Sequence, residues 1–204
     1  MLRKMEFLNP TTQKIMATLL RQLAAPPTIA MLAETLNITH VGAWKAIKKL
    51  QEAQFITIES AGTKKNSTYM AYLNWDNPLV KKMLALMLEH EARQQRRWIV
   101  NFAELEKKVD FLILYCSILH LPKEANDIDI IGVVSNNKNF SDINKIILKI
   151  QSTQLKKIHV INFTPQEFKA ELKKQNKAFI DAIKKGVVLF GQNKFVKFVK
   201  ELSQ

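Results

Sequence analysis

The sequence predicts a two-domain α+β chain with a long connecting helix, in which the second domain is of the α/β type with a mixed sheet. Three observations lead to this prediction. Three short helical patterns and two alternating strands fill residues 1–76, and a long helical pattern fills residues 77–109. Residues 110–204 then alternate apolar runs typical of buried strands with amphipathic helices. We therefore expect two domains on either side of a connecting segment.

Turn and capping residues delimit three short helices in the first part. Asn9-Pro10 opens the first helix, and Ala25-Pro26-Pro27 ends it because proline cannot continue a helix. Thr28 and Thr39 have side chains that cap helix N-termini, so we expect them to begin the second and third helices. The third helix is expected to run to about Ala53. Its buried face is expected to hold Ala43, Ile47 and Leu50.

Two strands complete the first part, and a long helix follows them. Phe55–Glu59 and Thr68–Leu73 have the alternation and composition of strands, and the turn between them has a basic tip. From Pro78 to about Glu106 the pattern is that of one continuous helix, apolar at first and polar later. This helix is the expected connection between the domains.

The last part alternates strands with helices. Phe111–Tyr115 and Ile128–Val134 are continuous apolar runs, which is typical of strands buried on both faces, and Ile158–Phe163 is a third strand. Helical patterns occupy Ser141–Ser152, Pro165–Gln175, Ala178–Lys185 and Lys194–Leu202. Only five glycines occur in the chain, so a glycine-rich phosphate-binding loop is not expected.

The charge balance indicates a polyanionic partner. The chain has 31 basic and 18 acidic residues and a formal charge of +13. Long-range attraction and counterion release both favour binding to nucleic acid under such a balance. The alternative is a generally lysine-rich composition, because the lysines are scattered over the whole chain. Charge alone does not decide between these two interpretations.

Composition also indicates the cellular compartment and excludes some kinds of site. No apolar run approaches the roughly 20 residues that a membrane span needs, and the basic N-terminus lacks an apolar stretch of signal-peptide length. We therefore expect a cytoplasmic protein without a membrane partner. The single cysteine, Cys116, excludes an intrachain disulfide and a zinc site built from cysteines.

Residues 29–56 carry the elements of a DNA-reading module. The second helix ends in Leu36-Asn37-Ile38-Thr39, and the third ends in the run Ile47–Ile56, in which Gln54 stands where relatives have glycine. This stretch resembles the winged helix-turn-helix family, whose third helix lies in the major groove of double-stranded DNA. The expected contacts come from the outer face of that helix and from the wing tip: Thr39, His40, Trp44, Lys45, Lys48, Lys64 and Lys65.

The residues of this set have different expected roles. The four lysines suit phosphate contacts, whereas Thr39 and His40 can donate to base edges or phosphates. Because an exposed indole is costly to leave in water, Trp44 is expected to pack against the neighbouring helix, with stacking on a sugar or base as the alternative. The whole face also has another interpretation, as a solvated basic helix in a module that contacts proteins.

A strand, a turn with serine and a strand that begins with two carboxylates form the main motif of the last part. It reads Leu114-Tyr115-Cys116-Ser117, followed by Asp127-Ile128-Asp129. Residues two apart on a strand face the same side, so Asp127 and Asp129 can hold the same divalent metal ions. Two such ions align a triphosphate with an attacking hydroxyl in many enzymes.

This motif resembles the small nucleotidyltransferase domains of the DNA polymerase β superfamily. The likeness continues through residues 157–168 and 187–191. Proteins with a winged helix, a connecting helix and such a domain form a recognisable prokaryotic group. The resemblance implies Mg²⁺ and NTP as cofactors, metal ligation by Asp127 and Asp129, and a catalytic role for these two residues and Ser117.

The sequence departs from this family at three places. Cys116 replaces the glycine before the serine and adds a Cβ where the backbone approaches phosphate. His120-Leu121 stands in place of Arg-Gly, and the later strand offers His159 or Asn162 where a third carboxylate is normal. We therefore favour a DNA-binding protein, a transcriptional regulator, whose nucleotidyltransferase fold has lost most of its chemistry. The roles left open for that domain are nucleotide binding, oligomerisation and added nonspecific DNA affinity. The alternative is an active Mg²⁺-dependent enzyme that transfers NMP to a protein, RNA or small molecule.

Other chemically active residues of the last part are expected to be structural. Cys116 ends a buried strand and is expected to pack rather than act as a nucleophile. His120 and His159 are expected to be ordinary polar residues rather than a metal site.

The start of the long helix offers a way for the chain to assemble. Leu79, Met83 and Leu86 recur at the spacing of a dimer seam, so a homodimer is expected. The alternative is that this stripe docks onto the first domain. An RNA partner is a third possibility for the basic surface, but no RNA-specific aromatic motif supports it.

Overall fold

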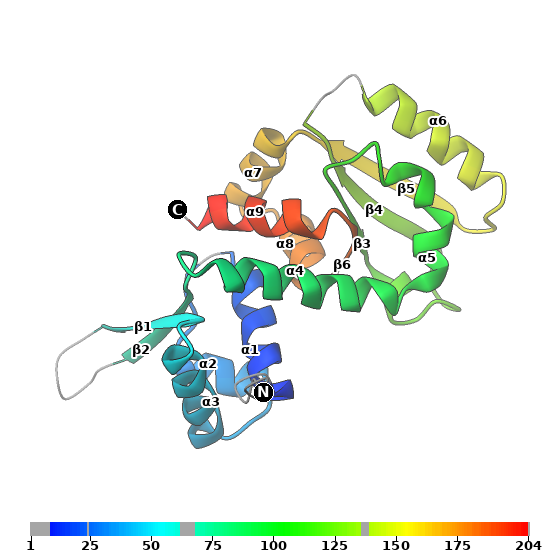
Figure 1. Ribbon diagram of the computed structural model, residues 1–204. Coiled ribbons are helices and arrows are strands. Elements are labelled where there is room, and N and C mark those ends of the chain that lie inside the picture. Colours follow the sequence, from blue (N-terminus) through cyan, green and yellow to red (C-terminus); the bar gives the residue numbers. More distant parts are fainter. Residues whose placement is uncertain (1–8, 24, 62–67, 136–138, 204) are drawn as a thin grey trace, which may run out of the picture. The chain divides into compact units, whose positions relative to one another are not determined.

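The structure, a computed structural model of the 204-residue chain, describes residues 9–23, 25–61, 68–135 and 139–203 (Figure 1). It has a mixed α+β fold with a mixed four-stranded sheet, which confirms the predicted class at that level. The chain divides into two compact units between Met87 and Leu88. Among the described helices, none combines the length and the apolar character needed to cross a membrane.

Three helices begin unit 1, close to the predicted bounds: α1 (Pro10–Arg21), α2 (Ile29–Thr35) and α3 (His40–Glu52). Their caps are also as predicted, because the side chains of Asn9, Thr28 and Thr39 each accept a hydrogen bond from a backbone N–H in the first turn. The helices enclose an apolar core that includes Ile15, Met16, Leu20, Leu32, Ala43, Ile47 and Leu50. The sequence therefore sets this bundle through its caps and its apolar stripes.

A hairpin of β1 (Ile56–Ala61) and β2 (Thr68–Leu73) follows the bundle. The strands are antiparallel, and β2 has a second partner, because Thr28 forms an isolated antiparallel bridge with Met70. This bridge was not predictable from the sequence, because the segment before α2 consists of prolines and a single capping residue. The hairpin is thus attached to the helices through the chain that leads into α2.

α3 ends in a left-handed turn at Gln54, whose φ is 60°. The Phe55 N–H donates to the Leu50 carbonyl oxygen at 2.8 Å, which closes the helix end. The side-chain amides of Asn74 and Asn77 donate to the Gln54 carbonyl oxygen at 2.9 and 3.0 Å. These bonds hold a non-glycine residue in a conformation that glycine adopts most easily.

The single long helix predicted for residues 78–106 is interrupted, so this prediction was wrong. α4 (Pro78–Arg93) is followed by the separate α5 (Arg96–Asn101) and a short 3₁₀ turn, η1 (Ala103–Leu105). Ala92 and Trp98 are both buried in the core of unit 2. On one unbroken helix, side chains six residues apart would point in directions about 120° apart around the axis. The interruption allows both side chains to face the same core.

The sheet of unit 2 has the strand order β5-β4-β3-β6. Its strands are β3 (Phe111–Tyr115), β4 (Asp127–Val133), β5 (Lys157–Phe163) and β6 (Val187–Phe190). β4 and β5 are parallel, whereas β3 is antiparallel to both of its neighbours. The sheet is therefore mixed, as predicted.

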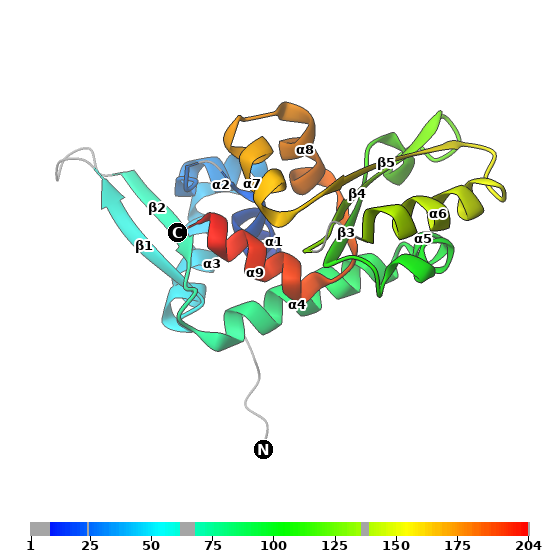
Figure 2. The ribbon, with the colours of Figure 1, turned by 90° about the horizontal axis from the view of Figure 1, so that it is seen from above.

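Helices cover both faces of this sheet, and Figures 1 and 2 show α6 on one side and α7 and α8 on the other. The bounds are α6 (Asn139–Gln151), α7 (Pro165–Lys173), α8 (Lys177–Lys185) and α9 (Gln192–Leu202). Leu112 and Leu114 belong to the core that includes Trp98 and residues of α6. Phe111 points the other way, where its ring lies 6.3 Å from that of Phe168 on α7 and 5.4 Å from that of Phe195 on α9. Burial on both faces explains the continuous apolar run of β3.

Candidate functional site

α3 presents a basic face to solvent in unit 1. Its inner residues, Ala43, Ala46, Ile47 and Leu50, are buried in the bundle. Its exposed residues include His40 at the start of the helix and Lys45, Lys48 and Lys49 opposite the buried side, and we call these four the α3 basic face. Because the buried residues hold the helix in position, this face presents its cations on a rigid element.

Trp44 lies at the edge of the α3 basic face and is half-buried. Its ring makes an edge contact with the Tyr69 ring of β2, with centroids 5.1 Å apart. The packing partner is therefore a strand rather than the neighbouring helix that was predicted. The Lys48 amine lies 5.2 Å from the Trp44 ring centroid and donates to the Gln51 side chain at 3.0 Å. These contacts keep Lys48 close to the helix surface.

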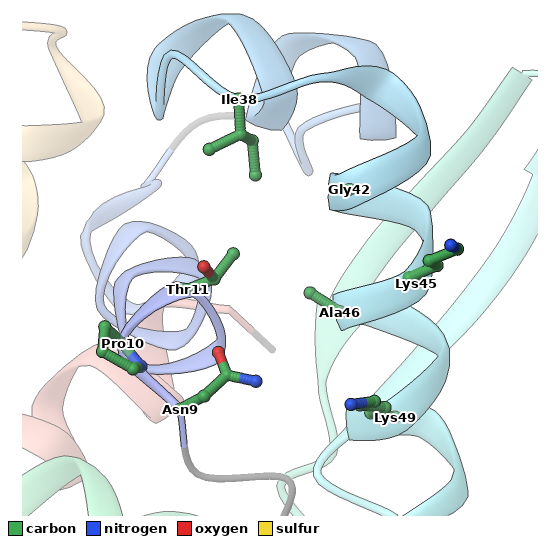
Figure 3. A pocket seen from close by; sticks show the side chains of 8 residues that line it. All are labelled: Asn9, Pro10, Thr11, Ile38, Gly42, Lys45, Ala46 and Lys49. Carbon is green, nitrogen blue, oxygen red and sulfur yellow. The ribbon is translucent and has the colours of Figure 1, made fainter.

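A groove of about 420 Å³ lies between the start of α1 and α3 (Figure 3). It is lined by Asn9, Pro10, Thr11, Ile38, Gly42, Lys45, Ala46 and Lys49. In Figure 3 the Lys49 amine turns toward the α1 side, whereas the Lys45 amine turns away from it. The N-terminal end of α1 carries the positive end of the helix dipole. Both walls of the groove therefore favour a negatively charged group.

Of the other residues predicted to contact DNA, two are exposed at the start of α3 and two lie outside the described residues. Thr39 is exposed, and its hydroxyl oxygen accepts from the Gly42 N–H at 3.1 Å as the cap of α3. His40, at the first position of α3, is exposed. Lys64 and Lys65, at the expected wing tip, lie outside the described residues.

Asp127, Asp129 and His159 converge on one face of the sheet in unit 2, and we call them the carboxylate–histidine cluster. Asp129 pairs with His159 in the parallel register of β4 and β5, and Asp127 lies two residues earlier on the same face. His159 Nδ1 is 3.5 Å from Asp127 Oδ2 and 3.4 Å from Asp129 Oδ1. One ligand atom from each of the three residues lies within 4.8 Å of the other two.

His159 was expected to be an ordinary polar residue, and its convergence with the two aspartates is new information from the strand register. The alternation of β5 indicates that His159 shares a face with Ile161 and Phe163, but only the pairing with β4 brings it beside Asp129. His120 is not a member of any metal-ligating group among the described residues. Among the described residues, His159 therefore belongs to a potential metal-ligating group and His120 does not.

Cys116 joins β3 to a short 3₁₀ turn, η2 (Ser117–Leu119), with φ 70° and ψ −166°. This conformation is essentially confined to glycine. The side chain is exposed, so the prediction that Cys116 packs was wrong: the turn directs the thiol toward Asp129 instead of into the core. Ser117, the predicted catalytic serine, begins η2 and is exposed.

The carboxylates also change the acidity of their neighbours. Partial burial raises the pKa of Cys116 to about 12, and the hydrogen bond to Asp129 and the charges of Asp129 and Asp127 contribute to this rise. Burial likewise raises the pKa of Tyr115 to about 12, with contributions from the negative charges beside it. Both side chains are therefore neutral near pH 7, and Cys116 does not have the thiolate character that a nucleophile needs.

Comparisons of the chain with models of protein families, with curated proteins and with solved structures found no match. The function of the protein is therefore inferred from two candidate sites. One is the α3 basic face with its groove, and the other is the carboxylate–histidine cluster.

Proposed function

We propose that the protein binds double-stranded DNA through α3 and acts as a transcriptional regulator. The observation that carries this proposal is the α3 basic face, in which three exposed lysines lie opposite the buried side of α3 and an exposed histidine begins the helix. Two further features support it: the short turn between α2 and α3, and the hairpin that follows α3. This is the order of elements in a winged helix-turn-helix module.

In this proposal, α3 enters the major groove and its first residues, Thr39 and His40, approach the base edges. Lys45 and Lys48 bind backbone phosphates on one side. Lys49 lines the groove beside the start of α1, where the helix dipole adds to its positive charge, so a phosphate fits there too. Trp44 has a supporting role, because it fixes α3 to β2 through Tyr69.

The test is a titration of labelled duplex DNA with the full chain, followed by fluorescence anisotropy. We expect the Lys45→Ala/Lys49→Ala variant to bind at least about tenfold more weakly, because two phosphate contacts are removed. Lys81→Ala/Lys82→Ala is the matched control, since these lysines are an exposed pair on α4. Equal loss in both variants would mean that binding follows net charge, and no loss in the α3 variant would exclude α3 as the DNA site.

For unit 2 we propose a nucleotidyltransferase-like fold without transfer activity. The antiparallel pair β3–β4 and the parallel pair β4–β5 support the fold assignment, together with Asp127 and Asp129 at the start of β4. The contacts of these carboxylates argue against activity. The Cys116 thiol and the His159 imidazole both contact them, at the location where the resemblance requires two Mg²⁺ ions.

An active nucleotidyltransferase is the second candidate, and the convergence of the two aspartates favours it. The test is incubation of the protein with each radiolabelled NTP, Mg²⁺ or Mn²⁺, and cell extract. We expect no labelled acceptor. Labelling that disappears in the Asp127→Ala variant would establish the enzyme instead.

We also propose that the protein acts as a homodimer through the start of α4. Leu79 and Leu86 are 55% and 62% exposed, and Met83 is half-buried between them in sequence. Sedimentation of a Leu79→Glu/Leu86→Glu variant should give monomers. The control Leu148→Glu changes an exposed leucine on α6 and should leave the dimer intact. A monomeric parent protein would contradict the proposal.

A further inference from the structure

We propose that Asp127, Asp129 and His159 bind a single transition-metal ion of the Zn²⁺ type, in place of the pair of Mg²⁺ ions that the nucleotidyltransferase resemblance implies. This inference is independent of DNA binding, because it concerns only side chains of unit 2. It rests on the geometry of the cluster and on the chemistry of its donor atoms.

The spacing of the donor atoms fits one small cation. Two ligands that share a tetrahedral Zn²⁺ ion at about 2.0–2.1 Å lie roughly 3.3 Å from each other. His159 Nδ1 lies 3.5 Å from an oxygen of Asp127 and 3.4 Å from an oxygen of Asp129. All three donor atoms lie within 4.8 Å of one another, so a small movement of the Asp side chains completes the arrangement.

The backbone makes this arrangement rigid. Asp127 and Asp129 lie on β4, and His159 lies opposite Asp129 in the parallel register of β5. Ile128 lies between the two aspartates and Ile158 directly precedes His159, and both are buried and anchor their strands. The cluster is therefore held by a hydrogen-bonded sheet rather than by a loop, which favours a defined coordination geometry.

The donor set favours a borderline metal over Mg²⁺. Carboxylate oxygens alone suit Mg²⁺, which also requires octahedral geometry and retains several waters, whereas imidazole nitrogen suits Zn²⁺, Co²⁺ and Ni²⁺. The histidine occupies the strand where a third carboxylate would complete a two-magnesium site. Zinc accepts both imidazole and carboxylate ligands, and three protein ligands leave a further position for water, as in other three-ligand zinc sites.

Solvent can reach the cluster. The side chains of His159, Asp127 and Asp129 are 44%, 36% and 16% exposed, so an ion has an entry path and room for water ligands. The Cys116 thiol beside Asp129 is a neighbouring sulfur donor, and its contribution is measurable separately.

The experiment is a titration of the full chain, stripped of metal by a chelator, with Zn²⁺, Co²⁺ and Mg²⁺ by isothermal calorimetry. We expect one Zn²⁺ per chain and an affinity for Mg²⁺ that is at least about a hundredfold weaker. Cobalt provides a spectroscopic readout, because the intensity of its visible bands reports the coordination geometry. If the parent shows a sulfur-to-cobalt band and Cys116→Ser loses it, the Cys116 thiol is a further ligand of the same ion.

The variants separate this site from adventitious binding. His159→Ala and Asp127→Asn are expected to weaken Zn²⁺ binding at least tenfold, with their folding verified by circular dichroism. His90→Ala is the matched control, because His90 is an exposed histidine on α4 outside the cluster, and it should bind like the parent. Absence of Zn²⁺ binding, an equal affinity for Mg²⁺, or binding that survives His159→Ala would overturn the proposal. None of these outcomes alters the DNA titration, which tests the proposed function separately.

Discussion

Four non-glycine residues of the described chain have positive φ, and two of them, Gln54 and Cys116, differ in what supports their turns. Gln54 in unit 1 has φ 60°, and hydrogen bonds to its carbonyl oxygen and across the helix end stabilise its turn. Cys116 in unit 2 has φ 70° with ψ −166°, a combination that is almost restricted to glycine. Cys116 also adjoins Asp129, whose negative charge faces its thiol.

The two residues also differ in the energetic cost of their backbone conformations. A residue such as Gln54 ends a helix in the left-handed α region at modest cost. The conformation of Cys116 costs on the order of 1–3 kcal/mol, and such strain clusters at functional sites. The turn beside the carboxylates thus keeps a shape suited to glycine although the glycine is absent. Of the two turns compared, only the one at Cys116 is strained, and Gln175, also in unit 2, ends a helix at positive φ as Gln54 does.

The largest expected effect comes from restoring glycine at the strained turn. Cys116→Gly is expected to increase the free energy of unfolding by about 1–2 kcal/mol, because it removes the Cβ from a glycine-only conformation and this gain exceeds the added chain entropy. Gln54→Gly should give a smaller gain of a few tenths of a kcal/mol, since its conformation is less restricted. Urea unfolding followed by circular dichroism measures both. The control Cys116→Ala keeps a Cβ and should not stabilise the protein; equal stabilisation by Ala and Gly would show that strain is not the cause.

The second effect tests the support of the Gln54 turn. Replacing both Asn74 and Asn77 by Ala removes the two side-chain amides that donate to the Gln54 carbonyl oxygen. We expect a loss of about 1 kcal/mol in the free energy of unfolding, because both bonds are exposed. The same urea assay measures it. If the double variant is as stable as the parent, the turn does not depend on these amides.

The smallest expected effect is on the pH dependence of stability, through Asp110, which directly precedes β3. Burial tends to raise the pKa of Asp110, but hydrogen bonds from Lys194 and Ser135 and the charge of Lys194 outweigh it and hold the pKa below its ordinary value of 3.8. A carboxyl with a lowered folded-state pKa stabilises the fold above that ordinary value, and this contribution is lost as pH falls through the folded-state pKa. Thermal melts from neutral to acidic pH should therefore show a shallower acid dependence for Asp110→Asn. An unchanged acid dependence would contradict this role of Asp110.

Much of unit 1 was predictable because its signals are local. Asn9, Thr28 and Thr39 cap the helices that they were expected to cap, although the first helix ends at Arg21, four residues before the predicted break at Ala25-Pro26-Pro27. The contact of Trp44 with Tyr69 was not predictable in detail, because it joins a helix to a strand 25 positions later in the sequence. Local patterns predict elements, whereas contacts between elements depend on the packed bundle.

Unit 2 was predictable at the level of its strands but not of its site. The apolar runs gave β3 and β4 close to their observed bounds, since both faces of these strands are buried. The position of His159 depends on the register between β4 and β5, which no local pattern encodes. The interruption between α4 and α5 was not predictable, because residues 93–97 are arginines and glutamines, which favour helix, and no proline or glycine marks the break.

The measurement that tests the central proposal most directly is the salt dependence of duplex binding by the full chain. The logarithm of the binding constant should fall linearly with the logarithm of salt concentration, because each phosphate contact releases a counterion. We expect the slope of Lys45→Ala/Lys49→Ala to be smaller than that of the parent by about two units, while Lys81→Ala/Lys82→Ala keeps the parent slope. An unchanged slope in the α3 variant, or no binding of duplex DNA by the parent at low salt, would contradict the account.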